Sequence, residues 1–199
     1  MSAHENLEHV EHAEHASHGG NKKIALLISI LALFLALSEM GGKSAQTEAV
    51  TLNVQANDLW SFFQAKTIRM TVLGTAAEQM QIELERATDP AVRDHIGGRI
   101  KEWKDNIARY DDDAKSNEGR KQLMARARAA EHKRDELLAR YHNFEFASAA
   151  FQIGIVLASA EVITSMVVLG WFAGLAGVIG IGFAALGAWF PHVHVLGGH

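Results

Sequence analysis

The sequence predicts an all-α membrane protein with three transmembrane helices and a long antiparallel coiled-coil hairpin between the first two. Three apolar stretches, at residues 22–42, 147–169 and 170–190, are each long enough to cross a hydrocarbon layer of ~30 Å as a helix. Charged residues gather between the first two stretches, and there the apolar residues recur at heptad spacing.

Composition alone does not favour a membrane, because 48% hydrophobic and 21% charged residues also suit a soluble domain. The segregation of charge does favour it: Ile24–Leu37 carries none, and Gly154–Phe190 carries only Glu161. The net charge of −4, with both signs interleaved, argues against nucleic acid as a partner. Without cysteine there is neither a disulfide framework nor a thiolate metal site.

Residues 1–21 are rich in His and Glu, hold few apolar side chains and are predicted to be a flexible tail. Residues 22–42 then form the first transmembrane helix, interpreted as an uncleaved signal anchor. Lys22-Lys23 at its start, against Lys43 just after its end, place the amino terminus in the cytoplasm by the positive-inside rule. Lys133, Arg134 and Arg140 argue the reverse, but charges in a long loop count for little.

Residues 43–146 are predicted to form the coiled-coil hairpin, with its turn near 88–91. Asp89-Pro90 marks that turn, because proline suits a first helical turn and restricts the residue before it. The return arm loses its heptad phase around Gly119, which predicts a kink or stutter. The seam of the first arm steps by four and three and contains one polar residue: Leu52, Ala56, Leu59, Phe63, Lys66, Met70, Leu73, Ala77, Met80, Leu84 and Ala87.

Residues 147–169 and 170–190 are predicted to be the second and third transmembrane helices, followed by a His-containing tail at 191–199. Small residues let helices approach closely in lipid, so these two helices are expected to pack as a tight hairpin and to leave a surface for a second copy. The small residues on the third helix are spaced by four: Ala176, Gly180, Ala184 and Ala188.

The segment Gln55-Ala56-Asn57-Asp58-Leu59-Trp60-Ser61-Phe62-Phe63-Gln64-Ala65-Lys66 resembles the signature of uncharacterised bacterial membrane proteins of domain-of-unknown-function family 4337. The wider layout is similar too, with paired carboxyl-terminal spans beginning near Phe144-Glu145-Phe146-Ala147. One departure is Phe62-Phe63, where the resemblance leads us to expect tyrosines. The resemblance implies a multi-pass protein of the bacterial inner membrane and no particular activity.

Glu161 is the candidate intramembrane ionisable residue, since a carboxyl group in an apolar span must be protonated, paired or facing water. One hypothesis makes it a proton or cation site. The preferred interpretation is a neutral acid that hydrogen-bonds a serine, a threonine or a backbone carbonyl, and Ser165 lies one turn away.

The signature segment is the candidate ligand or partner surface. The preferred interpretation is structural: Lys66, within the seam, would pair with an acidic residue on the return arm and set the register, while Trp60 would lie in the core. The polar and aromatic residues of this candidate surface are Gln55, Asn57, Asp58, Trp60, Gln64 and Lys66.

Histidines in the two tails are candidate zinc or nickel ligands, but their spacing does not define one ligand face, and a solvated, pH-sensitive tail is the preferred interpretation. No other cofactor is expected. The histidines concerned are His9, His12, His15, His18, His192 and His194.

No catalytic motif is present: the chain lacks a phosphate-binding glycine loop, a nucleophile elbow and a His-Glu-x-x-His helix. We therefore expect no enzyme, but an integral membrane scaffold or adaptor that forms homo-oligomers, contacts lipid and binds a protein partner through the hairpin. The alternative is a small oligomeric ion or proton channel, or a metal-transport accessory, that uses Glu161 and the His-rich tails.

Overall fold

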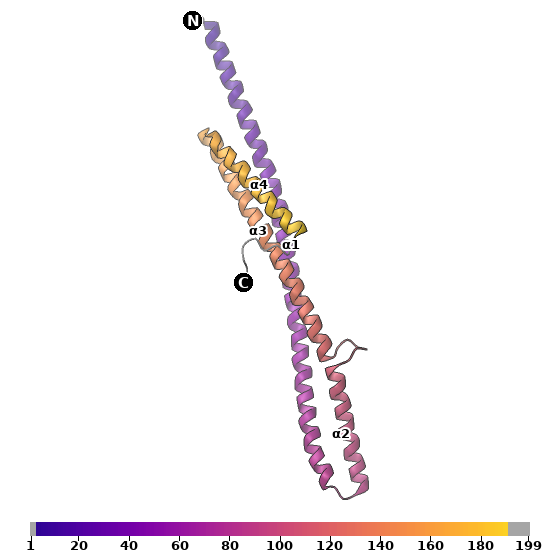
Figure 1. The fold of residues 1–199 in the computed structure, drawn as a ribbon. Helices are drawn as coiled ribbons and strands as arrows, with labels where there is room; N and C mark the ends of the chain where they lie inside the picture. Colours follow the sequence, from indigo (N-terminus) through magenta and orange to yellow (C-terminus); the bar gives the residue numbers. More distant parts are fainter. Residues whose placement is uncertain (1–2, 191–199) are drawn as a thin grey trace. The chain divides into compact units, whose positions relative to one another are not determined.

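The computed structural model describes residues 3–190, with side chains from Lys22 onward, and this part of the chain is all-helical without strands (Figure 1). The all-α prediction is confirmed. The four helices are α1 (Ala3–Arg86), α2 (Pro90–Asp111), α3 (Arg120–Thr164) and α4 (Val167–Trp189).

The described residues form two compact units. The apolar unit contains residues 3–48 and 136–190, and the polar unit contains residues 49–135. Both α1 and α3 run through the two units, whereas α2 belongs to the polar unit and α4 to the apolar one.

The apolar unit has a small buried core and an outer surface made largely of exposed apolar side chains. Leu31 of α1 packs with Ala147 and Phe151 of α3, and the rings of Phe34 and Phe151 stack with centroids 5.8 Å apart. Three helices (α1, α3 and α4) are long and apolar enough to cross a membrane. Their outward residues are largely exposed, which suits lipid as the surrounding solvent; examples are Leu26, Leu33, Val156, Ile163 and Val178.

Glycines let α4 approach both α3 and α1 in this unit. A Cβ atom on Gly180 would lie 2.7 Å from the ring of Phe151 on α3, and one on Gly177 would lie 2.8 Å from Leu31 on α1. The buried residues of α4 are spaced by three or four positions, or by their sum, as packing between long helices requires, whereas the predicted ladder is spaced strictly by four. Of the predicted small-residue ladder, Gly180 is therefore buried, Ala176 and Ala184 are half-buried, and Ala188 is exposed.

The turn between α3 and α4 lies at Ser165-Met166, earlier than the predicted boundary between residues 169 and 170. Ser165 adopts a φ of 58°, the left-handed conformation that commonly ends helices, and its N–H donates to the Glu161 carbonyl at 2.8 Å. The boundary was misplaced because neither glycine nor proline marks this turn.

The polar unit buries the face that the heptad pattern selects. Every seam residue from Leu52 to Ala87 is buried or half-buried, and Leu59 packs against Leu123 and Ala127 of α3. At the tip of this unit, Asp89 is the N-cap of α2 and accepts the Ala91 N–H at 2.8 Å. Pro90 follows in the first turn, as its fixed φ allows.

The return arm is two helices, because residues 112–119 form a hydrogen-bonded loop where the sequence predicts only a kink or stutter. The Gln122 amide donates to the Asp112 carboxylate at 2.6 Å and accepts the Asp113 N–H at 3.2 Å. Arg120 pairs with Asp111 at 2.8 Å. These side-chain bonds replace helical ones, so α2 ends at Asp111 and α3 begins at Arg120.

The predicted flexible tail lies partly within the described residues, since α1 begins at Ala3. The second tail, residues 191–199, lies outside the described residues.

Candidate functional site

Glu161 lies in the last turn of α3, three residues before that helix ends at Thr164. Its expected place in the middle of a span followed from the later boundary predicted for the turn. The residue is buried, with 9% of its surface exposed. The structure records no hydrogen bond or ion pair to this carboxylate among the described residues.

The hydroxyl partners expected for Glu161 are not used. Thr164 donates its hydroxyl to the Ala160 carbonyl at 2.8 Å, and Ser165 is exposed in the turn. The carboxylate instead lies against Gly170 of α4, where the Cβ of any other residue would collide with it. Glycine at position 170 therefore makes the space that Glu161 occupies.

A cavity of about 240 Å³ adjoins Glu161 in the apolar unit. Lys23 lines the same cavity, so that one carboxylate and one ammonium group face a shared space. The sequence did not connect these residues, because their proximity depends on where α3 turns into α4. The other lining residues come from α1 and α4: Ile24, Leu27, Val167, Gly170, Trp171 and Gly174.

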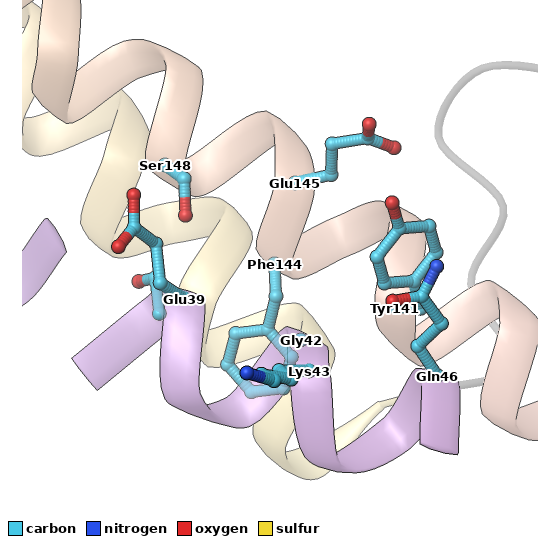
Figure 2. Close-up of a pocket in the computed structure, with 9 residues that line it drawn as sticks. Glu39, Gly42, Lys43, Gln46, Tyr141, Phe144, Glu145 and Ser148 are labelled. Atoms are coloured by element: carbon cyan, nitrogen blue, oxygen red, sulfur yellow. The ribbon is translucent and has the colours of Figure 1, made fainter. Parts of the chain in front are cut away.

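A second cavity, of about 300 Å³, lies at the other end of the apolar stretches, between α1 and α3 (Figure 2). Figure 2 shows Glu39 and Ser148 on one side, and Tyr141 and Gln46 on the other. Phe144 closes the space between the helices, because a Cβ atom on Gly41 would lie only 2.9 Å from its ring. Ser38, Gly42, Lys43 and Glu145 complete the lining.

Sequence reasoning missed this second cavity. Its signal was the Gly41-Gly42 pair at the end of one apolar stretch and Phe144 at the start of the next, which together mark a close approach of two helices. Glu145 is also 3.4 Å from the Nδ1 atom of His142, on an exposed surface. The lining of this second cavity therefore combines positive and negative charges with hydroxyl and amide groups.

The candidate surface of the signature segment divides between two faces of α1. Trp60 lies inside the polar unit, where its indole N–H donates to the Glu131 carboxylate at 2.8 Å and its ring meets Phe63 edge-on. Lys66 is buried, and its ammonium nitrogen lies 5.7 Å from the centre of the Tyr110 ring. The recorded partner of Lys66 on the return arm is thus an aromatic ring, where the sequence predicts an acid.

The other four residues of the candidate surface, Gln55, Asn57, Asp58 and Gln64, are exposed. Gln55 and Asp58 line a cavity of about 290 Å³, whereas Asn57 and Gln64 do not. The structure thus brings two of the six predicted residues together in a pocket. The other lining residues are Leu59, Phe62, Glu118, Leu123 and Arg126.

The loop at 112–119 carries the perturbed charges of the polar unit. The Gln122 amide and the Lys121 ammonium lower the pKa of Asp112, and the Ser116 backbone N–H lowers the pKa of Asp113. Asp112 and Asp111 raise the pKa of Lys121 in return. These groups are exposed or half-buried and hold the loop between α2 and α3.

The histidines of the two predicted metal sites fall outside the residues whose side chains the structure describes, so the zinc or nickel hypothesis stays a prediction. Within the described side chains, no group of three or more His, Asp or Glu residues is arranged to hold a metal ion.

Comparison with known proteins places most of the chain in a family. The family model described as a domain of unknown function, DUF4337, matches residues 20–190, which contain all three apolar stretches and the whole of α2 and α4. No curated protein and no solved structure matches the chain. Because the family model covers most of the sequence, including the signature segment, the chain belongs to the DUF4337 family.

Proposed function

We propose that this protein is a scaffold or adaptor of the bacterial inner membrane that crosses the bilayer three times and self-associates through its polar unit. A structural role agrees with a chain rich in helix-packing surface and without a catalytic motif. The observation that carries the proposal is an exposed stripe on α1, outside the apolar stretches.

This outer stripe consists of aliphatic residues that are between 51% and 64% exposed: Val50, Val54, Ile68, Val72 and Ile82. At 100° per residue they fall on one face of α1. Val54, Ile68 and Ile82 are spaced by multiples of seven, the repeat that keeps one helix facing another. The stripe therefore has the period of a second helix-packing seam.

Charge is scarce around the outer stripe. From Val50 to Ile82 the charged residues are Asp58, Lys66, Arg69 and Glu78, and Lys66 is buried. An exposed helix of a monomer usually carries charge over its solvated face, so this composition favours a covered surface. Because the stripe carries no charge of its own, two copies of it meet without repulsion, and a second copy of the chain is the proposed occupant.

The charges beside the first apolar stretch support the proposed topology. Lys22 and Lys23 stand at its start, and the α3–α4 turn at residues 165–166 carries no charge. With the amino terminus in the cytoplasm, that turn is also cytoplasmic, and the polar unit, the proposed coiled-coil hairpin, projects from the opposite surface.

A charge-insertion experiment tests the proposal. The Val54→Lys/Ile68→Lys double variant of the full chain should lose its higher oligomer in detergent, as measured by light scattering coupled to gel filtration. The matched control is Ala129→Lys, which adds a charge to an exposed position of α3 off the stripe. An unchanged mass for the double variant, with the wild-type chain oligomeric, would place the interface elsewhere, and a monomeric wild-type chain would end the self-association proposal.

The alternative, a channel or metal-transport accessory, draws on Glu161 and the tails. Glu161 packs against Gly170 of its own chain, one turn from the end of α3. A proton or cation pathway is therefore the less favoured function. Unchanged ion flux for Glu161→Gln in liposomes would remove it.

A further inference from the structure

The Glu161 cavity holds an unmatched carboxylate. Removing an ionised carboxyl group from water is unfavourable unless a cation or hydrogen-bond donors replace the water. Glu161 is 9% exposed, and the nearby Thr164 hydroxyl donates to its own helix. Glu161 lines the cavity, so an N–H donor placed there would satisfy the carboxylate.

Lys23 supplies a cation at the same cavity, but these two described residues do not form an ion pair with each other. One negative and one positive group thus face the cavity at separate places. Their complement is a zwitterion, with its ammonium group toward Glu161 and its anionic group toward Lys23.

The rest of the cavity is apolar and runs along α1 and α4. Ile24 and Leu27 form one wall and Val167 another, while Gly174 leaves open space, since a Cβ atom there would meet nothing within 4 Å. Trp171, 79% exposed, borders the cavity, and tryptophan is enriched at the level of lipid headgroups. An acyl chain fits such a groove, and a phosphate fits its cationic end.

From this arrangement we propose that the Glu161–Lys23 cavity binds one phospholipid with a primary-ammonium headgroup, such as phosphatidylethanolamine. The carboxylate of Glu161 accepts N–H bonds from the ammonium, and Lys23 contacts the phosphate. A quaternary ammonium has no N–H to donate, and an anionic headgroup brings a like charge to Glu161. The site therefore selects among headgroups.

The experiment uses the full chain in detergent, titrated with short-chain phosphatidylethanolamine, phosphatidylcholine or phosphatidylglycerol, with bound lipid counted by native mass spectrometry. Phosphatidylethanolamine should bind about tenfold more tightly than the other two, equivalent to about 1.4 kcal/mol. Glu161→Gln should abolish this preference. Glu39→Gln, the same change in the second cavity, should preserve it.

Two further variants separate the parts of the site. Lys23→Gln should weaken all three lipids alike, because they share the phosphate, and Gly174→Val should weaken all three by filling the groove. Equal affinity of the wild-type chain for the three lipids would overturn the proposal, as would a preference that survives in Glu161→Gln. Tighter binding of phosphatidylethanolamine to Lys23→Gln would show that Lys23 pairs with Glu161 and would also overturn it. Since one chain lines the cavity, none of these results depends on self-association.

Discussion

Trp60 of α1 donates its indole N–H to the carboxylate of Glu131 on α3, at 2.8 Å, within the polar unit. Both side chains are half-buried, and Phe63 packs edge-on against the indole ring. The bond joins positions 71 residues apart in the chain. The bond fixes the register of α3 along α1, because one donor on α1 can reach only one acceptor on α3. Apolar seam contacts are less specific, since one apolar residue can replace another as a partner.

Trp60→Phe should therefore destabilise the polar unit. The change keeps an aromatic ring but leaves the half-buried Glu131 carboxylate without its donor, which costs about 1–3 kcal/mol. Hydrogen exchange of the full chain in detergent measures this directly, as faster exchange at residues 56–66 and 123–135. Trp103→Phe is the matched control, since Trp103 stacks beneath Arg99 at 5.3 Å. Equal effects of the two substitutions would mean that the Trp60 bond adds nothing to the register.

The polar unit shows what heptad patterning predicts well. The burial of the seam from Leu52 to Ala87 follows from the spacing of apolar residues, and the break at Asp89-Pro90 follows from backbone restriction. Both signals are local in sequence. The break between α2 and α3 was not foreseen in full, since it depends on Gln122 reaching back to Asp112 and Asp113.

The candidate sites were harder to predict than the helices. Glu161 is easily identified as the one charged residue in a long apolar stretch. Predicting that it lines the same cavity as Lys23 requires the correct position of the α3–α4 turn. Ser165 adopts a left-handed conformation, but no glycine at this position marks the turn in the sequence. The second cavity likewise depends on Phe144 packing onto Gly41 across two helices, which spacing within one helix cannot reveal.

Gly180→Ala should destabilise the apolar unit more than the same change two residues away. A Cβ atom at position 180 would lie 2.7 Å from the Phe151 ring, which is fully buried and cannot move aside freely. Overpacking of this kind costs about 1–3 kcal/mol. The measurement is the midpoint of thermal unfolding of the full chain in detergent.

Gly182→Ala is the control for that experiment, because a Cβ atom at position 182 meets nothing within 4 Å. The methyl group there should leave the midpoint unchanged or raise it slightly, since alanine favours helix over glycine. Equal midpoints for Gly180→Ala and Gly182→Ala would show that α3 and α4 do not pack through Phe151 and Gly180.

The loop at residues 112–119 should loosen at acidic pH. The pKa values of Asp112 and Asp113 are lowered in the folded chain from an ordinary value of 3.8, so their contribution to stability is present above that pH and is lost as the pH falls through the lowered values. The raised pKa of Lys121 acts in the opposite direction: its contribution to stability is complete below pH 10.5 and disappears at higher pH.

Local opening of the loop, measured by limited proteolysis between Asp112 and Gly119 with an acid-tolerant protease, should therefore be lowest between about pH 5 and 9 and rise below about pH 4. Asp112→Asn should show more cleavage than the wild-type chain at neutral pH and a weaker increase on acidification, whereas Asp94→Asn, at an exposed position of α2, should follow the wild-type profile. A wild-type cleavage rate that stays flat from pH 6 to 3, after correction for the protease's own pH dependence, would mean that these carboxylates do not hold the loop.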